Sequence, residues 1–189
     1  MKIGVLALQG DFEEHLEVLR GLGATGRAVR LPRDLEDVDG LIIPGGESTT
    51  ILKLLHNYRI TASLRQRVND GLPLMGTCAG LVVVARAVSK DSITPLDFID
   101  ITVRRNAFGR QRESFEANLT VAGLGEMPYH AIFIRAPMIE RVGAGVEVMA
   151  TLADGTIVAA RQGSVMVAAF HPELTPDQRW HQHFLELIA

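Results

Sequence analysis

One stretch of the sequence decides the fold: Leu72-Pro73-Leu74-Met75-Gly76-Thr77-Cys78-Ala79-Gly80-Leu81-Val82-Val83-Val84-Ala85. Two apolar runs flank a turn in which Gly76 and Gly80 frame Cys78. This is the cysteine form of the nucleophile elbow, a tight turn between a strand and a helix. Such a turn holds its central side chain at the carboxyl end of the strand, where the dipole of the helix favours a thiolate. The alternative is a structural cysteine in a glycine-rich bend.

The first half of the chain alternates between short apolar runs and amphipathic segments. The apolar runs predict strands over 3–8, 27–31, 39–43 and 72–75. The amphipathic segments predict a helix capped by Asp11, a helix opened by Ser48 or Thr49, and a helix over 60–68. Strands that are apolar throughout are typical of a parallel sheet covered by helices on both faces.

The second half is richer in strands. They are expected over 98–104, 115–121, 131–134, 146–152, 156–161 and 165–170, followed by a last helix over 175–188. Turn signals between the strands indicate antiparallel hairpins at the edge of a mixed, mainly parallel sheet. Because no repeat or linker interrupts residues 1–189, we expect a single α/β domain.

The composition excludes several classes of protein. The net charge of -3 gives no general attraction to nucleic acid or to an anionic membrane. One cysteine excludes an internal disulfide and an all-cysteine metal site. The sequence has no apolar run of membrane-spanning length and no signal peptide pattern, so the expected location is the cytoplasm.

A nucleophilic cysteine needs a base, and His171 is the strongest candidate. It follows an apolar strand and begins the run His171-Pro172-Glu173. Residues two apart in extended chain point the same way, so Glu173 can orient the imidazole while its other nitrogen faces Cys78. The sequence therefore predicts a Cys-His-Glu triad. The alternative is an ordinary surface turn at the end of a strand.

The other histidines receive structural interpretations. His15 follows two glutamates and is expected on a solvated helix surface. His181 and His183 are two apart on a predicted helix, so they face different directions and make a poor metal pair. His56 and His130 are interpreted as structural, and no metal site is predicted.

A second glycine-rich turn, Pro44-Gly45-Gly46-Glu47-Ser48, ends one predicted strand and begins a helix. Glycine there lets a backbone N–H point into a cleft, as the stabilisation of an oxyanion requires. A plain strand–helix turn is one alternative. A phosphate-binding loop is another, although the lysine of a Walker motif is absent.

Four arginines crowd one short segment: Arg104, Arg105, Arg110 and Arg112. A nucleic-acid patch is one interpretation, but the chain is acidic overall and the cluster stands alone. A loop that binds a substrate carboxylate fits better, because arginine grips carboxylates with two parallel hydrogen bonds.

Several motifs together carry a family resemblance. They are Leu6-Ala7-Leu8-Gln9-Gly10, Pro44-Gly45-Gly46-Glu47-Ser48-Thr49-Thr50, Gly76-Thr77-Cys78-Ala79-Gly80, Arg105-Asn106-Ala107-Phe108-Gly109-Arg110-Gln111, Ser114-Phe115-Glu116, Phe133-Ile134-Arg135-Ala136-Pro137 and Phe170-His171-Pro172-Glu173-Leu174-Thr175. Over nearly the whole chain they closely resemble the PdxT family, the glutaminase subunits of pyridoxal 5'-phosphate synthase. The elbow and the His-Pro-Glu run alone indicate only a class I glutamine amidotransferase. The Gly-Gly-Glu-Ser-Thr-Thr and Arg-Asn-Ala-Phe-Gly-Arg-Gln runs narrow the resemblance to this subfamily.

The resemblance implies a flavodoxin-like, three-layer fold and a reaction. The enzyme would hydrolyse L-glutamine to L-glutamate and ammonia for vitamin B6 biosynthesis. Ammonia would pass to a (β/α)8-barrel synthase subunit, which in this family activates the glutaminase and makes pyridoxal phosphate. The glutaminase itself would need no cofactor.

The resemblance also assigns residues to roles. Cys78 would be the nucleophile, His171 the base and Glu173 the orienting acid. The glutamine site would be lined by Gly46, Glu47, Ser48, Arg105, Ile134 and Arg135. Gly45, Gly46 and Ala79 would form the oxyanion hole, and Gln9 would lie toward the synthase.

Two other classes of function remain as alternatives. The same elbow serves cysteine peptidases and proteins of the DJ-1 type, but these would not explain the segment from Arg105 to Gln111. A non-catalytic regulatory subunit with this fold is the other, and the intact Cys78, His171 and Glu173 argue against it.

Overall fold

The first half of the chain folds as alternating strands and helices, as its apolar runs predict. The computed structural model describes residues 1–108 and 113–188. The elements in order are β1 (Lys2–Leu6), α1 (Phe12–Gly21), β2 (Thr25–Val29), the 3-10 helix η1 (Pro32–Leu35), β3 (Gly40–Ile43), α2 (Ser48–Asn57), α3 (Ile60–Asn69), β4 (Leu74–Thr77) and α4 (Ala79–Val84). β3 and β4 are buried at every residue, which explains why their sequences are apolar without alternation.

The second half is mostly strands. The elements are β5 (Ala85–Val88), β6 (Ile99–Arg104), β7 (Ser114–Leu119), β8 (Tyr129–Ile134), β9 (Met138–Val142), β10 (Glu147–Thr151), β11 (Ile157–Gln162), β12 (Val165–Ala168), the 3-10 helix η2 (Pro172–Leu174) and α5 (Arg179–Glu186). In β6 and β8 buried and less buried residues alternate, as expected for strands with one face toward the core.

Within residues 1–108 and 113–188, ten strands form one mixed sheet. Nine follow the order β2-β1-β3-β4-β12-β11-β9-β6-β5, and β10 pairs with β11 outside that order. The strands from β2 to β12 are parallel, whereas β11 and β9 run antiparallel to their neighbours. β7 and β8 form a separate antiparallel pair. The prediction of an α/β fold with a mixed, mainly parallel sheet and antiparallel hairpins is confirmed.

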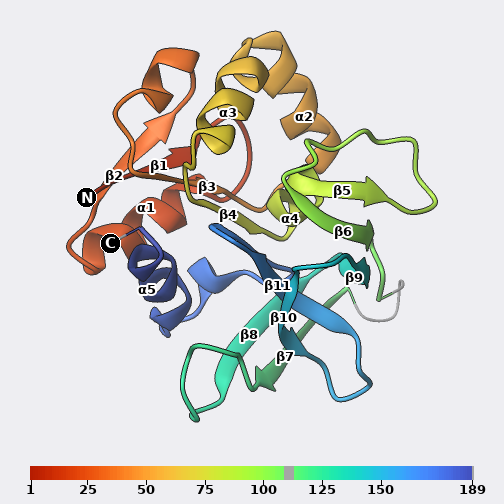
Figure 1. Cartoon of the computed structure of the whole chain (residues 1–189). Coiled ribbons are helices and arrows are strands. Elements are labelled where there is room, and N and C mark those ends of the chain that lie inside the picture. The colour runs from red at the N-terminus through yellow and green to blue at the C-terminus, as the bar shows by residue number, and fades with distance from the viewer. Residues whose placement is uncertain (109–112, 189) are drawn as a thin grey trace.

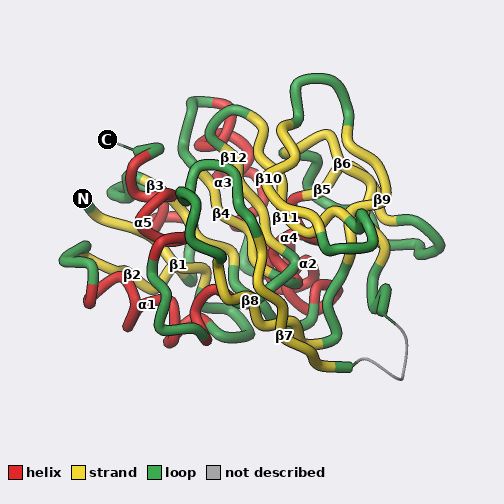
Figure 2. Tube along the Cα trace, turned by 90° about the horizontal axis from the view of Figure 1, so that it is seen from below, coloured by secondary structure: helices red, strands yellow, loops and turns green. Residues whose placement is uncertain are grey.

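Helices cover both faces of the parallel strands. Figure 1 shows α1 and α5 on one side of them and α2 and α3 on the other, where α4 packs against α2. Both views place the two termini close together, so the first and last helices are neighbours (Figures 1 and 2). This proximity brings side chains from the two ends of the sequence behind the site described below.

Three elements differ from the sequence-based expectations. After the elbow, α4 ends at Val84 and β5, which was not predicted, begins at once. β9 was not predicted, because Met138–Val142 carries two charged residues among its five. The last helix begins at Arg179 rather than at Thr175, and the Arg179 backbone N–H donates to Asp177 Oδ1 at 3.1 Å just before that start.

None of the helices in the described ranges is both long enough and apolar enough to cross a bilayer.

The close approach of α4 to β3 gives a prediction about stability. A Cβ atom added at Gly80 would lie 2.0 Å from the Ile43 carbonyl oxygen, which belongs to a buried strand that cannot move aside. Gly80→Ala is therefore expected to lower the free energy of unfolding by about 1–3 kcal/mol, the usual cost of overpacking. Urea denaturation measures this change as a shift of the midpoint.

Gly21→Ala is the matched control for Gly80→Ala. Its Cβ would meet only the flexible Gln178 side chain, at 3.0 Å, so its unfolding midpoint should stay near that of the parent. Equal midpoints for the two variants would show that the contact between Gly80 and β3 is unimportant.

Candidate active site

Cys78 lies in a strained turn between β4 and α4. Its backbone angles are φ 47° and ψ −105°, outside the regions that a non-glycine residue normally adopts. Its N–H donates to the Ala168 carbonyl oxygen of β12 at 2.8 Å, which holds the turn against the sheet. A Cβ at Gly76 would lie 2.9 Å from the Gly80 backbone, so these glycines are required by close packing. This is the geometry of a nucleophile elbow.

Four of the loops that carry site residues lie at one edge of the sheet. Gln9, Gly46, Cys78 and His171 follow β1, β3, β4 and β12, which are consecutive neighbours in the sheet. The register pairs Ile43 with Gly76, so these strands end at similar heights. Because parallel strands present their carboxyl ends at the same edge, residues far apart in sequence meet there.

His171 and Glu173 form the tightest polar contact of the site. His171 Nδ1 donates to Glu173 Oε1 over 2.6 Å. Burial lowers the pKa of His171, but the hydrogen bonds to Cys78 and Glu173 outweigh burial and raise that pKa to about 10. Since Nδ1 is committed to Glu173, Nε2 is the nitrogen that remains for the thiol.

Glu173 lies behind His171, at the start of η2. Its side chain is fully buried, and burial raises the pKa of its carboxyl group, while the hydrogen bond from His171 opposes that rise. The second oxygen, Oε2, faces His15 Nε2 at 3.3 Å. The carboxylate is therefore held between two imidazoles, one in front of it and one behind.

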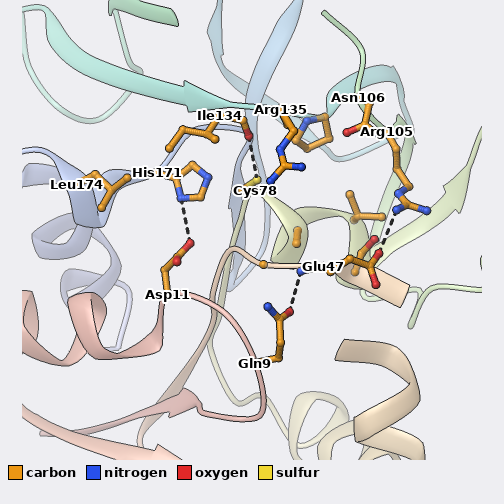
Figure 3. A pocket seen from close by; sticks show the side chains of 15 residues that line it. Gln9, Asp11, Glu47, Cys78, Arg105, Asn106, Ile134, Arg135, His171 and Leu174 are labelled. Atoms are coloured by element: carbon orange, nitrogen blue, oxygen red, sulfur yellow. Dashed lines mark hydrogen bonds and ion pairs between the residues drawn. The ribbon is translucent and has the colours of Figure 1, made fainter. Parts of the chain in front are cut away.

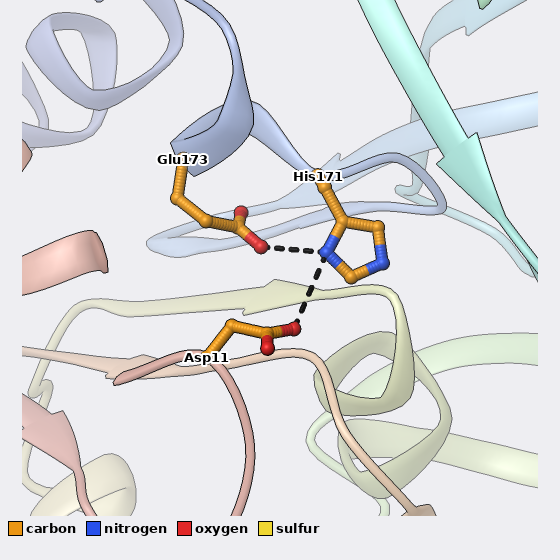
Figure 4. A group of neighbouring side chains, drawn as sticks. All are labelled: Asp11, His171 and Glu173. Carbon is orange, nitrogen blue, oxygen red and sulfur yellow. Dashed lines mark hydrogen bonds and ion pairs between the residues drawn. The ribbon is translucent and has the colours of Figure 1, made fainter. Parts of the chain in front are cut away.

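Asp11 places a second carboxylate beside His171. Its Oδ2 lies 3.6 Å from His171 Nδ1 (Figure 4). The sequence predicts Asp11 as the cap of a helix. The residue does occupy the N-cap position of α1, but its side chain accepts no capping hydrogen bond. The carboxylate points into the site instead, which capping patterns cannot reveal.

A cavity of about 520 Å³ opens in front of Cys78 (Figure 3). It is lined by Gln9, Asp11, Gly46, Glu47, Ser48, Cys78, Ala79, Val82, Arg105, Asn106, Ile134, Arg135, Pro137, His171 and Leu174. All predicted site residues are in this lining except Glu173, which lies behind His171, and Gly45. The structure thus brings the predicted residues together.

Gly45 and Gly46 are packed tightly between His171 and the loop that follows β1, called the first loop here. The Gly45 carbonyl oxygen accepts a hydrogen bond from the Asp11 N–H at 3.2 Å. A Cβ at Gly45 would lie 2.6 Å from His171 Cε1, and one at Gly46 would lie 2.6 Å from Gln9 Oε1. Gly46 also has a φ of 148°, which favours glycine. Side chains at either position would displace groups of the site.

Gln9 is hydrogen-bonded directly to the glycine-rich turn that follows β3. Its Oε1 accepts a hydrogen bond from the Glu47 N–H at 2.7 Å. This contact links the end of β1 to the turn after β3. The orientation of the glycine loop therefore depends on a residue of the first loop.

Two arginines at the cavity differ in their partners. Arg105 contacts Glu47 at 3.1 Å and Asp91 at 2.9 Å. Burial tends to raise the pKa of Glu47, but hydrogen bonds from Thr50 and Thr49 outweigh it and lower that pKa to about 2. Arg135 has no ion-pair partner within the described parts of the chain. Its guanidinium can therefore form an ion pair with a ligand carboxylate without breaking an existing ion pair.

The remaining arginines of the predicted cluster do not form a patch that the structure describes. Arg104 pairs with Glu140 at 3.3 Å, away from the cavity. Arg110 and Arg112 lie outside the described residues.

β8 brings Ile134 and Arg135 over the nucleophile. Phe133 stacks on Phe115 with ring centroids 4.5 Å apart, and it packs edge-on against Phe170 at 5.8 Å. The His171 N–H donates to the Ile132 carbonyl oxygen at 2.8 Å. The Ile134 carbonyl oxygen consequently lies 3.9 Å from Cys78 Sγ.

The expectation that His15 is a solvated surface residue is wrong. Its side chain is fully buried, and its Nδ1 lies 2.8 Å from Nε2 of the equally buried His181. The helical spacing contained the signal, because residue 15 falls between Phe12 and Leu19 on the apolar stripe of α1. The two preceding glutamates had suggested a solvent-exposed position instead.

Asp11, His171 and Glu173 also form a cluster that could hold a metal ion. One potential ligand atom from each lies within 4.8 Å of the others (Figure 4). However, His171 Nδ1 carries the proton of the 2.6 Å hydrogen bond to Glu173, and a cation there would displace it. The arrangement suits proton transfer better than metal binding.

Comparison with known proteins identifies the family. A profile of the SNO glutamine amidotransferase family matches residues 5–189. The chain belongs to the SNO glutamine amidotransferase family. Among proteins similar to this SNO family member, one from Herpetosiphon aurantiacus is 54% identical over 99% of this chain and 100% of its own length. Another from Roseiflexus sp. is 52% identical over the same shares. Both are named pyridoxal 5'-phosphate synthase subunit PdxT.

Solved structures agree with the SNO family assignment. One described as a glutamine amidotransferase is 51% identical, with a TM-score of 0.93 and 98% of each chain covered. A second, the PurLQS structure from Thermotoga maritima, has a TM-score of 0.71 at 15% identity, covers 100% of this chain and 98% of its own, and supports the fold alone. The resemblance seen in the motifs of this SNO family chain is confirmed.

Proposed function

We propose that this chain is the glutaminase subunit of a pyridoxal 5'-phosphate synthase and that Cys78, His171 and Glu173 carry its reaction. It hydrolyses L-glutamine to L-glutamate and ammonia through a thioester on Cys78. The observation that carries the proposal is the 2.6 Å hydrogen bond between His171 and Glu173, beside a cysteine in an elbow at the base of a 520 Å³ cavity. Family membership and relatives named PdxT support the same reaction.

The proposed chemistry has two half-reactions. The Cys78 thiolate attacks the side-chain amide carbon of glutamine, and His171 gives its Nε2 proton to the departing ammonia. A water molecule then attacks the thioester carbon while His171 takes its proton, and glutamate leaves with Cys78 regenerated. Glu173 keeps Nδ1 protonated throughout and stabilises the imidazolium.

Backbone N–H groups supply the proposed oxyanion hole. Ala79 follows the nucleophile at the first position of α4, where a backbone N–H has no partner within the helix. The Gly45-Gly46 peptide supplies the second donor when it is turned toward Cys78. Each such donor typically contributes about 3–4 kcal/mol to the stability of the transition state.

The glutamine backbone is proposed to bind at the polar rim of the cavity. Arg135 pairs with its carboxylate, because Arg135 has no ion-pair partner in the described ranges. Arg105, Glu47, Ser48 and Ile134 complete the site, with Gly46 beneath them.

The partner is a (β/α)8-barrel synthase subunit that receives the ammonia. The proposed interface includes Gln9 and the first helix, because Gln9 contacts the Glu47 N–H of the glycine-rich turn. We also propose that residues 1–189 work as one glutaminase domain in the cytoplasm, without a cofactor of their own.

The partner should switch the glutaminase on. Adding the synthase to the purified chain is expected to raise glutamate release at least about tenfold, which needs only about 1.4 kcal/mol of barrier lowering. The physical reason is that the glycine peptide can point its N–H into the cavity or away from it, and docking next to Gln9 selects the donating orientation. A coupled glutamate assay measures the change. Full activity of the chain alone, unchanged by the synthase, would contradict this prediction.

Gln9→Ala tests how that activation is transmitted. Without the Gln9 contact to the Glu47 N–H, the synthase should no longer stimulate glutamate release fully, whereas alkylation of Cys78 should proceed as in the parent. Gln66→Ala, which removes an exposed glutamine of α3, is the control and should be activated normally. A Gly45 variant is unsuitable for this purpose, because its side chain would strike His171.

A further inference from the structure

A column of buried polar groups stands behind the triad. His15 of α1 and His181 of α5 are both fully buried, and their rings are joined by the 2.8 Å contact between Nδ1 and Nε2. His15 Nε2 lies 3.3 Å from Glu173 Oε2 and 3.2 Å from Thr77 Oγ1, the residue before the nucleophile. The column therefore contacts both the acid of the triad and the strand that carries Cys78.

Both histidines of the column are neutral near pH 7. Burial lowers the pKa of His15 well below its usual range, and the neighbouring His181 and His171 lower it further. Burial alone lowers the pKa of His181 to about 3. A neutral imidazole has one N–H, so each ring donates one hydrogen bond and accepts at its other nitrogen.

The position of every proton in the column follows from the carboxylate. As the ionised acid of the triad, Glu173 can only accept, so we assign the His15 proton to Nε2, which also contacts Thr77 Oγ1 at 3.2 Å, and Nδ1 is then an acceptor. His181 must then donate from Nε2 to that acceptor. His181 Nδ1 is left as an unprotonated nitrogen, consistent with its having no hydrogen-bond partner among the described residues. In this assignment the His181 N–H points to His15 Nδ1, and the His15 N–H lies between Thr77 Oγ1 and Glu173 Oε2.

We propose that His15 is a positioning residue of the reaction, which holds Glu173 as a carboxylate facing His171, and that His181 fixes the tautomer of His15. The proposal rests on the proposed glutaminase function. Glu173 Oε2 is buried and has no aligned hydrogen bond in the described structure, so the His15 N–H dipole at 3.3 Å is the favourable contact that the structure gives it. Because His15 is neutral, this contact brings no second positive charge that would compete with the His171 imidazolium for the carboxylate.

Removal of this dipole has a defined consequence. Burial favours the protonated form of Glu173, and without His15 the carboxyl group would take a proton more readily. A protonated Glu173 no longer stabilises the His171 imidazolium. The other titratable groups that face Glu173 are Asp11 from α1 and Tyr129 from β8. Neither replaces an N–H donor at Oε2.

The main experiment measures glutamate release by the complex with excess synthase. His15→Leu should lower kcat about tenfold or more with KM nearly unchanged, as expected for losing a contact to a charged group. The acid limb of the kcat–pH profile should move up by about half a unit or more. His15→Gln places an amide donor near the Nε2 position and should recover most of the kcat.

Phe184→Leu is the matched control for core perturbation. Phe184 is a fully buried residue of α5 that packs toward β3 at Gly40 rather than against the triad, so kcat per folded site and its pH profile should stay at the parent values. The thermal unfolding curve of each preparation gives its folded fraction. Equal losses in His15→Leu, His15→Gln and Phe184→Leu, with the acid limb unmoved, would overturn the proposal.

A second measurement needs no variant. Nitrogen-15 NMR of the histidine rings in the parent chain at pH 7 should show both His15 and His181 as neutral rings protonated at Nε2. A charged His15, or a His15 protonated at Nδ1, would refute the proposal even where a variant fails to fold. If the parent complex releases no glutamate, the proposed function fails, while the NMR result still decides the arrangement of the column.

Discussion

Cys78→Ala is expected to abolish glutamate release from glutamine by the complex. In the proposed mechanism the thiolate forms the covalent bond to the substrate, and the chain has no other cysteine to replace it. Alanine tolerates the same turn without a larger side chain, so the elbow between β4 and α4 should persist. A coupled assay with excess synthase and saturating glutamine measures the loss.

Ammonium provides the control for Cys78→Ala. If the variant folds and still binds the synthase, supplying ammonium chloride should restore product formation, because only the source of ammonia is missing. Thermal unfolding and co-elution with the synthase establish that both conditions hold. Glutamate release by Cys78→Ala at the parent rate would show that the nucleophile lies elsewhere.

Glu173→Gln should slow turnover strongly while leaving glutamine binding nearly intact. The corresponding Asp→Asn change in a serine protease triad costs about 10⁴-fold in kcat. In the variant, the amide would face His171 Nδ1 on one side and His15 Nε2 on the other. Both nitrogens are proposed to carry a proton, so both positions require a hydrogen-bond acceptor. An amide offers only one acceptor atom, so one of the two contacts becomes unfavourable. His171→Asn should be at least as damaging.

Glu186→Gln is the isosteric control for Glu173→Gln. Glu186 is exposed on α5, and neutralising it should leave kcat and KM at parent values. Single-turnover kinetics separate binding from chemistry in both variants. Activity of Glu173→Gln within a few-fold of the parent would reduce Glu173 to a structural residue of η2.

Local sequence patterns were sufficient to predict that Cys78, His171 and Glu173 come together. The glycine-framed Cys78 and the His171-Pro172-Glu173 run each have a spacing that fixes geometry within a few residues. Four of the site-bearing loops follow strands, and parallel strands present their carboxyl ends together, so their meeting could be anticipated. The strand–helix alternation likewise predicted the parallel half of the sheet.

The two histidines behind the triad, His15 and His181, could not be predicted from local sequence patterns. The contact of His15 with Glu173 joins the first helix to the last part of the chain, and its partner His181 comes from α5. Which helices pack side by side is a property of the whole fold. Asp11 was missed for a related reason, because a residue at a helix N-cap was expected to bond its own helix rather than a distant histidine.

The position of β12 makes the site depend on completed folding. This strand lies between β4 and β11 near the middle of the sheet, although it comes late in the sequence. Until it is inserted, β4 and β11 are open edges, and the loop with His171 is not beside Cys78. Such non-local pairing is expected to form slowly. Under the proposed mechanism, the step that closes the sheet therefore also assembles the reactive pair, and partly folded chains are expected to release no ammonia.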